Sequence, residues 1–362
     1  IHRDERFAEK LATPDVTVAD IVGDVDPIKA ANLKLSYADD RVIHYGMIPR
    51  ANRCIFVINE MPELQARIQV SLFNILQEGD IQIRGFKLRL PLDMQFVFTA
   101  NPEDYTNRGS IVTPLKDRIG SQILTHYPDS IEVAKTITAQ EAKLQKNRVC
   151  EIHIPELAKD LVEQIGFEAR NSEFVDSKSG ISARMSITAY ENLLSTAEHR
   201  CIASGENQTS IRFADILGMI PSIIGKVELV YEGEQEGAAY VAERLIGSAS
   251  KTLFDKYFPA IKKLKHEDEK DTYDGIMQWF FEQSSFELMD DGSEDEYSAA
   301  LNDITPLDDL ISTYMPKAIA TDRLFIKEFM LWALVEYKKL NKKRILKGFE
   351  FKDSYGAYLS NL

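Results

Sequence analysis

Two apolar segments of this sequence end in side chains that could take part in chemistry. Asn59 and Glu60 directly follow CIFVI, residues 54–58, and Asn101 follows MQFVFTA, residues 94–100. Ligands of open α/β sheets bind outside the carboxyl ends of the strands, where these side chains would meet. A glutamate there can polarise a water molecule. Asn59 offers an oxygen acceptor, but it lacks the charge that an aspartate would bring to a metal ion.

Two arginines further along the chain could bind a phosphate. Arg118 lies in TPLKDRIG, and Arg184 lies at the helix start in GISARMSI. The planar guanidinium fits phosphate oxygens, so either arginine could stabilise their charge. Each site residue also has an ordinary interpretation. Arg118 could pair with Asp117 at the surface, and Asn101 before Pro102 could be a turn residue. A cation at a helix start opposes the helix dipole, and a phosphate opposite Arg184 would explain it.

These residues need a sheet to position them, and the hydrophobic pattern predicts one. CIFVI and MQFVFTA are typical of strands inside a parallel sheet, and SQILTHY, residues 121–127, is predicted as a third strand. An amphipathic helix between them ends near Gly79. Residues 80–93 alternate about Arg84-Gly85 and predict a hairpin. Strand, helix and strand in this order predict an α/β fold with a mainly parallel sheet.

The rest of the chain is predicted to be mainly helical. A helix is expected from about Pro27, followed by a second helical piece in MIPRANR. Acidic runs near 266–271 and at 290–296 interrupt the C-terminal part, and such runs are usually solvated loops. After about Pro128, helices are predicted near 129–146, 155–171, 182–204 and 211–219, and in the tail from about Lys226.

Composition narrows the class of protein. The 362 residues allow two or three domains with sizeable cores. The net charge of −14 argues against a large basic face for nucleic acid. No apolar run approaches the ~20 residues that span a bilayer, so we expect no membrane association. Cys54, Cys150 and Cys201 show no metal-ligand spacing and are typical of reduced thiols in a cytoplasmic protein.

Four segments taken in order resemble the AAA+ ATPases, in the branch of the magnesium-chelatase motor subunit and the MoxR-type ATPases. PRANRCIFVINEMPEL is similar to the passage into the family's Walker B strand, and FTANPEDY to its sensor-1 passage. IVTPLKDRIG resembles the arginine-finger passage, and GISARMSI the start of the sensor-2 helix. SYADDRVIHYG and the 80–93 hairpin stand where this branch carries its helix-2 insert and pre-sensor-1 hairpin. The resemblance covers residues 14–127 well and 128–225 in part.

The resemblance implies three parts. Residues 1–127 would be the C-terminal part of the AAA+ core, 128–225 an α-helical lid with sensor 2, and 226–362 a helical C-terminal extension. The phosphate loop GxxxxGK[ST] occurs nowhere in the chain, which begins at Ile1. We therefore expect the N-terminal Walker A portion to be missing from this sequence. The chain alone is expected to be inactive, and the intact protein to hydrolyse ATP.

Position by position, the resemblance implies a role for each site residue. Glu60 would be the base that polarises the attacking water, and Asn59 would hold Mg²⁺ indirectly, through a metal-bound water. Asn101, as sensor 1, would orient the attacking water near the γ-phosphate. Arg118 would reach into the site of the neighbouring subunit, and Arg184 would contact phosphate. ATP and Mg²⁺ are the implied cofactors.

The implied assembly is a homo-oligomer, a hexameric ring that works with a von Willebrand-type domain partner. A magnesium-chelatase motor, which drives magnesium insertion into a porphyrin, is the first hypothesis, and a MoxR-type remodelling ATPase is the second. A nucleotide-sensing scaffold with little turnover is an alternative from another class, and Asn59 supports it. An enhancer-dependent transcription activator is disfavoured, because the sequence contains no GAFTGA-type loop.

Overall fold

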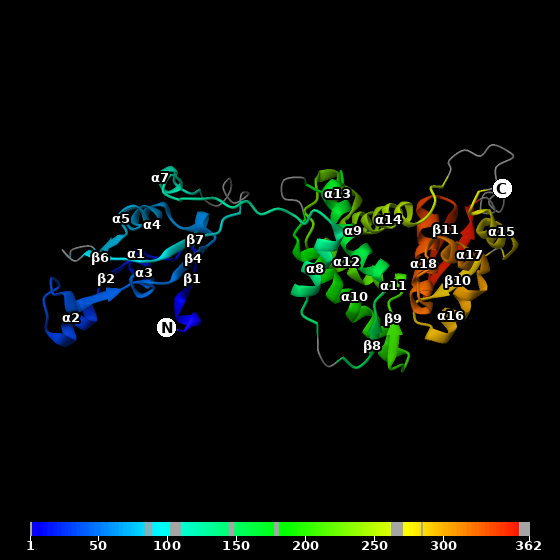
Figure 1. The fold of residues 1–362 in the computed structure, drawn as a ribbon, viewed down its shortest axis with the longest axis horizontal. Coiled ribbons are helices and arrows are strands. Elements are labelled where there is room, and N and C mark those ends of the chain that lie inside the picture. Colours follow the sequence, from blue (N-terminus) through cyan, green and yellow to red (C-terminus); the bar gives the residue numbers. More distant parts are fainter. Residues whose placement is uncertain are drawn as a thin grey trace. The chain divides into compact units, whose positions relative to one another are not determined.

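The computed structural model describes residues 2–83, 86, 89–101, 110–144, 148–176, 181–261, 271–283 and 285–354. The chain divides into two compact units, residues 1–125 and 126–362 (Figure 1). The first unit carries a parallel sheet, and the second is mainly helical. The α/β fold with a parallel sheet and a helical C-terminal region is therefore confirmed.

The sheet of the first unit has three parallel strands. They are β1 (Phe7–Leu11), β4 (Ile55–Asn59) and β7 (Gln95–Phe98), in the order β1-β4-β7. The register sets Leu11 beside Asn59 and Ile58 beside Phe98. Two of the predicted strands, β4 and β7, are thus present and adjacent. Strand β1 was not predicted.

The two faces of this sheet differ in burial. On one face, Phe56 and Ile58 are fully buried in a core shared with helices α4 (Ala66–Ser71) and α5 (Phe73–Glu78). The opposite face carries apolar side chains that remain exposed: Phe7 and Leu11 at 53% each, Ile55 at 46% and Val97 at 42%. The first unit therefore leaves one apolar sheet face uncovered by its described residues.

The helix between β4 and β7 and the following hairpin were predicted correctly. Gly79 caps the C-terminal end of α5, and its φ of 65° is left-handed, which suits glycine. Strand β5 (Asp80–Gln82) pairs antiparallel with β6 (Arg89–Pro91), while the predicted turn at Arg84-Gly85 lies outside the described residues. The remaining elements of this unit are η1 (Arg3–Arg6), α1 (Val18–Ile21), β2 (Gly23–Val25), α2 (Pro27–Leu33), η2 (Asp40–Val42), β3 (Ile43–Tyr45), α3 (Met47–Arg50), η3 (Met61–Glu63) and α7 (Thr113–Lys116).

The third strand, predicted at 121–127, is wrong. These residues form no regular structure, and Ile123 and Leu124 are 89% and 75% exposed. A strand is stable only when a neighbour pairs with its backbone N–H and C=O groups. No described strand pairs with this segment, so its apolar residues point into solvent.

The second unit contains the helices predicted between 129 and 219. Helices α9 and α10 match closely, α8 is shorter than predicted, and the last prediction resolves into α11 and η4. Helix α14 packs against both α9 and α18, which joins the early and late parts of this unit. The helices are α8 (Ile131–Glu141), α9 (Glu156–Asn171), α10 (Arg184–Ala203), α11 (Phe213–Ile216), η4 (Leu217–Met219), α12 (Ile220–Ile224), α13 (Tyr231–Glu236), α14 (Ala238–Tyr257), α15 (Asp274–Gln283), α16 (Glu294–Asp303), α17 (Thr305–Tyr314) and α18 (Ala320–Glu336).

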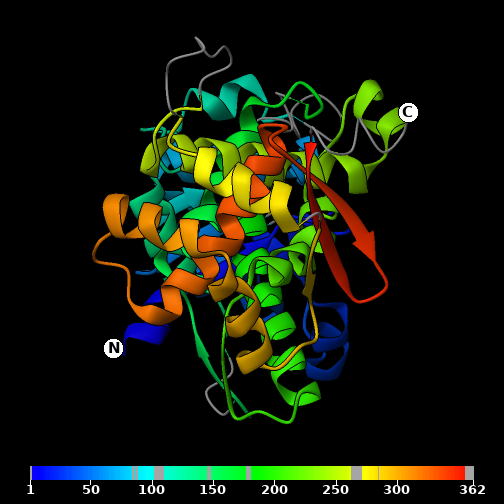
Figure 2. The ribbon, with the colours of Figure 1, turned by 90° about the vertical axis from the view of Figure 1, so that its right-hand side faces the viewer.

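The tail also contains strands that the sequence did not predict. Strands β10 (Phe286–Met289), β11 (Leu340–Ile345) and β12 (Gly348–Asp353) form an antiparallel sheet in the order β10-β12-β11. Figure 2 shows β11 and β12 in red as a hairpin. A short parallel pair, β8 (Glu151–His153) and β9 (Gln208–Ser210), completes the unit. The C-terminal region is thus helical with a small sheet.

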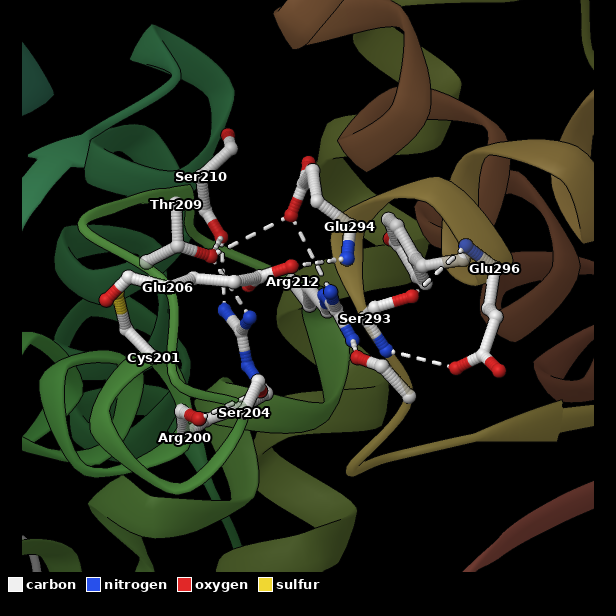
Figure 3. Close-up of polar contacts among 12 residues, drawn as sticks. Arg200, Cys201, Ser204, Glu206, Thr209, Ser210, Arg212, Ser293, Glu294 and Glu296 are labelled. Atoms are coloured by element: carbon white, nitrogen blue, oxygen red, sulfur yellow. Dashed lines mark hydrogen bonds and ion pairs between the residues drawn. The ribbon is translucent and has the colours of Figure 1, made fainter.

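A buried arginine ties residues 128–225 to residues 226–362. Arg212 is 1% exposed, and its guanidinium donates to the Gly292 carbonyl at 2.8 Å and to Glu294 Oε2 at 3.2 Å (Figure 3). It also lies 4.2 Å from the ring centre of Tyr297. The two segments share one hydrophobic core as well. Within residues 126–362, the C-terminal segment is therefore packed tightly on the helices before it.

The acidic run at 290–296 is only partly a loop. Asp290 and Asp291 pair with Arg344 and Lys347, each at 2.8 Å, whereas Glu294–Glu296 form the first turn of α16. The other acidic run, near 266–271, lies outside the described residues except for Asp271. None of the described helices is long and apolar enough to cross a bilayer.

Candidate functional site

The carboxyl ends of β4 and β7 join the side chains of Asn59 and Thr99 and the backbone of Glu60 by hydrogen bonds. Thr99 follows β7, and its Oγ1 donates to Asn59 Oδ1 at 3.2 Å. The same Oγ1 accepts the backbone N–H of Glu60 at 3.2 Å. The backbone extends the pairing, because the Met61 N–H donates to the Thr99 carbonyl at 2.9 Å. Asn59 and Glu60 therefore sit in a defined geometry at the edge where ligands of α/β sheets bind.

Glu60 has an unusual backbone conformation. Its φ of 57° is left-handed, a region that non-glycine residues rarely occupy. Its side chain is exposed at the end of β4. Unfavourable backbone conformations persist where the surrounding structure enforces them, and they concentrate at functional sites. The conformation directs the chain away from the sheet directly after the carboxylate that was predicted to act as a base.

Asn59 also contacts a residue that the sequence analysis missed. Its Nδ2 donates to Oε1 of Glu9, which lies on the neighbouring strand β1. The direction of both bonds is fixed, because Oδ1 accepts from Thr99 and only the amide nitrogen can donate to a carboxylate. An aspartate at position 59 could keep the bond from Thr99 but would face the Glu9 carboxylate without a proton.

Asn101 lies three residues beyond the end of β7, at the same edge of the sheet as Asn59. Its side chain is exposed. The following residues of the FTANPEDY segment, from Pro102, lie outside the described residues. The structure thus brings Asn101 to the edge predicted for it, as the parallel pairing of β4 and β7 requires.

Arg118 is held within its own unit. Its Nε and Nη2 donate to Gln77 Oε1 at 3.0 and 2.7 Å, and its Nη1 donates to the Pro114 carbonyl at 2.7 Å. Its guanidinium carbon also lies 5.0 Å from the ring centre of Phe73. These contacts replace the pairing with Asp117 that was considered from sequence. The side chain is half-buried, so a role in another subunit would require release from Gln77.

Arg184 is the first residue of α10, in the second unit. Its side chain is exposed and forms no ion pair with a described residue. The first turn of α10 contains no acidic residue. Ser182 engages two of its N–H groups, because its Oγ accepts that of Arg184 at 3.2 Å and its carbonyl accepts that of Met185 at 2.8 Å. The positive end of the helix therefore carries a cation that has no ion-pair partner among the described residues, and an anion there would offset both charges. Asn59 and Glu60 belong to the first unit.

The residues at the sheet edge fit a cation held through water better than one bound directly. No group of three or more histidine, cysteine, aspartate or glutamate side chains with metal-binding geometry occurs among the described residues. The Asn59 amide is already engaged on both sides, by Glu9 and Thr99. Magnesium usually keeps several of its waters and takes few protein ligands. An Asn59 that acts through a metal-bound water is compatible with that preference.

No family model and no curated protein matches this chain. Among solved structures, an ATPase candidate from Cytophaga hutchinsonii is 18% identical, over 67% of this chain and 76% of that one, with a TM-score of 0.28. NtrX from Brucella abortus is 15% identical, over 68% of this chain and 52% of its own, with a TM-score of 0.39. A complex of the magnesium chelatase subunits BchI and BchD is 17% identical, over 64% of this chain and 72% of that one, with a TM-score of 0.29. A function for this chain must therefore be argued from its own residues.

Proposed function

We propose that this chain carries the hydrolytic part of an AAA+ ATPase site. The observation that carries the proposal is the hydrogen bonding at the ends of β4 and β7, where the Thr99 hydroxyl donates to the Asn59 side chain and accepts the backbone N–H of Glu60. Asn101 follows the neighbouring strand β7 and lies at the same edge of the sheet. The motif order and the adjacency of the two strands support the same assignment, since ligands bind at this edge in α/β sheets.

The proposed chemistry is phosphoryl transfer to water. Glu60 accepts a proton from the attacking water, and Asn101 orients that water. Bound Mg²⁺ would neutralise charge on the phosphate oxygens, and Asn59 would hold it through a water molecule. Arg118 and Arg184 supply positive charge to the phosphates, Arg118 from a neighbouring subunit. Such sites work by positioning and electrostatic stabilisation, with little covalent chemistry by the protein.

The phosphate loop would come from a segment of the intact protein outside this sequence. Two features of the first unit support this. One face of the β1-β4-β7 sheet exposes Phe7, Leu11, Ile55 and Val97, although strands of parallel sheets are normally buried on both faces. The apolar segment at 121–125 has no strand partner among the described residues. Both would be explained by further elements that cover the sheet and extend it.

The proposed assembly is a ring, because Arg118 would complete the site of a neighbour. Within the family we favour a motor like that of magnesium chelatase, with a MoxR-type remodelling ATPase second, each acting with a von Willebrand-type domain partner. A nucleotide-sensing scaffold with little turnover is the competing function. Two observations favour it: Asn59 carries no charge, and Arg118 is engaged by Gln77 and Pro114.

Replacing Glu60 tests the proposal. In the intact protein, Glu60→Gln should lower ATP hydrolysis by about 10²–10⁴-fold and leave nucleotide affinity largely unchanged, because loss of a general base affects the transition state. Glu63→Gln, in the following 3-10 turn, is the matched control and should hydrolyse ATP at the wild-type rate. A Glu60→Gln protein with unchanged turnover excludes the hydrolytic role, and a wild type that binds but does not hydrolyse ATP favours the scaffold.

A further inference from the structure

The carboxylate nearest to Asn59 belongs to a different strand. Glu9 lies in the middle of β1, two residues before Leu11, which is the register partner of Asn59. Residues two apart on a strand share a face, so Glu9 and Asn59 point to the same side of the sheet. Glu9 accepts the Asn59 amide N–H and forms no ion pair with a described lysine, arginine or histidine. Its charge is therefore not neutralised by any described side chain.

This arrangement supplies the charge that the pair Asn59-Glu60 lacks. An aspartate at position 59 would carry a negative charge at the end of β4. Here the amide is neutral, but it is hydrogen-bonded to a carboxylate on the adjacent strand. An aspartate next to Glu9 would instead place two carboxylates in contact, and their like charges would repel. Asn59 and Glu9 are thus compatible neighbours, and the pair carries a single negative charge, which is that of Glu9.

We propose that Glu9 supplies the negative charge that retains the nucleotide-bound divalent cation, and acts as a positioning residue through Asn59. The inference rests on the proposed function. The hydrogen bond that the Asn59 amide donates to Glu9 fixes the orientation of the amide, so that Oδ1 remains on the side of Thr99 and Glu60. Hydrogen-bonded partners of this kind typically change metal affinity by about 10–100-fold when they are removed.

The charge can be separated from the hydrogen bond by substitution. Glu9→Gln keeps an oxygen that accepts from Asn59 but removes the charge. Asn59→Asp alone sets two carboxylates against each other. The double variant Glu9→Gln with Asn59→Asp restores a single negative charge and a donor–acceptor pair, now with the charge on β4. Glu5→Gln, an exposed residue of η1, is the matched control for loss of one acidic side chain nearby.

The experiment measures Mn²⁺, used in place of Mg²⁺, bound to the intact protein with a non-hydrolysable ATP analogue. The electron paramagnetic resonance signal of free Mn²⁺ gives the affinity without any turnover. Glu9→Gln should weaken Mn²⁺ binding by about 10–100-fold, the double variant should recover most of that loss, and Glu5→Gln should match the wild type. Circular dichroism of each variant checks that the sheet is intact.

The outcomes separate this inference from the proposed function. If the wild type holds Mn²⁺ with the analogue and Glu9→Gln binds it equally well, Glu9 only clamps Asn59 and the inference is wrong. A double variant no better than Glu9→Gln also overturns it, because the charge then does not act through this pair. If the wild type holds no Mn²⁺ with nucleotide, the proposed function itself fails.

Discussion

At the scale of single residues, the direction of hydrogen bonds explains an unexpected side chain. From sequence, Asn59 is a weakened version of a metal-binding aspartate. In the structure, its amide donates to Glu9 and accepts from Thr99, and an aspartate cannot do both. The asparagine is therefore the residue type that this neighbourhood requires. Sequence reasoning could not find this, because β1 was not predicted and Glu9 had no assigned neighbours.

A second residue predicts how stability depends on pH. Glu328 is fully buried, and its Oε2 accepts the Phe213 N–H and the Tyr297 hydroxyl, each at 2.7 Å. Burial raises the pKa of its carboxyl from 4.5 to about 7, although these two hydrogen bonds act in the opposite direction. Because the folded-state pKa is higher than the unfolded one, protonation stabilises the fold. The stabilisation is complete below about pH 4.5 and is lost as the pH rises through 7.

We therefore expect the free energy of unfolding of the second unit to fall by about 1–3 kcal/mol between pH 5 and pH 8. Trp279 and Trp332 both lie in this unit, so tryptophan fluorescence during urea titration reports on it alone. Glu328→Gln cannot ionise and should flatten the dependence. Glu287→Gln, at an exposed position of β10, should retain it. An equally steep dependence in Glu328→Gln would assign the titration to another group.

At the scale of elements, the start of α16 is stabilised by a capping box. The Ser293 side chain accepts the Glu296 N–H, and the Glu296 carboxylate accepts the Ser293 N–H at 2.9 Å. Ser293→Ala should lower the free energy of unfolding of the second unit by about 1 kcal/mol, since it leaves a helix N–H without a partner. Urea titration followed by tryptophan fluorescence measures this. Ser248→Ala, on an exposed position inside α14, should change stability little, and an equal loss in both variants would contradict the capping role.

Elements could be predicted from the sequence where a strand is apolar on both faces or where a helical pattern continues over many residues. The strands β4 and β7 and the helices α9 and α10 belong to this group. Three strands that were missed, β1, β11 and β12, mix charged and apolar residues in their sequences FAEKL, LNKKRI and GFEFKD. Strand β1 lies at one edge of its sheet and β11 at one edge of the other, and charged side chains are common on edge strands. The charged residues of β1 and β11 therefore interrupt the hydrophobic pattern from which a strand is predicted.

The residues of the candidate site also fall into those that the sequence could place and those that it could not. Asn59, Glu60 and Asn101 could be placed together from sequence, because adjacent parallel strands end at one edge. Thr99 had a detectable signal, since it precedes the recognised Asn101 by two residues at the end of a predicted strand. Glu9 and Gln77 had none, because their contacts span about 40 to 50 residues of sequence. Contacts of that range depend on tertiary pairing, which local patterns do not encode.

At the scale of the whole molecule, the sequence lacks the phosphate loop with which an ATP site normally holds the nucleotide. We expect residues 1–362 alone to bind ATP·Mg²⁺ weakly, because backbone N–H groups of a phosphate loop normally supply much of the binding and the sequence contains no such motif. Isothermal titration calorimetry should show a dissociation constant weaker than about 1 mM, corresponding to less than about 4 kcal/mol. Micromolar affinity in this chain would require a different phosphate site.

Arg118 decides between a ring motor and a binder that acts alone. A cation that acts on a neighbour's nucleotide stabilises the transition state by about 10³–10⁵-fold in rate and adds nothing to affinity in an isolated subunit. In the intact protein, Arg118→Ala should therefore abolish hydrolysis and leave nucleotide binding by the monomer unchanged. Gln77→Ala is the matched control, because it removes the main local partner of Arg118 and keeps the guanidinium. It should retain hydrolysis if Arg118 acts in another subunit, and should fail like Arg118→Ala if the contact with Gln77 is what matters.

Mixing two inactive variants gives the sharpest form of this prediction. Rings assembled from Arg118→Ala and Glu60→Gln subunits contain some interfaces where an intact Glu60 meets an intact Arg118 from the neighbour. Those interfaces should hydrolyse ATP, so activity should pass through a maximum as the mixing ratio changes. Mixed assembly is verified independently, by mass measurement of rings in which one variant carries a tag. If mixed rings form and no ratio recovers turnover, Arg118 does not act across the interface, and its contacts with Gln77 and Phe73 are then its role in the fold.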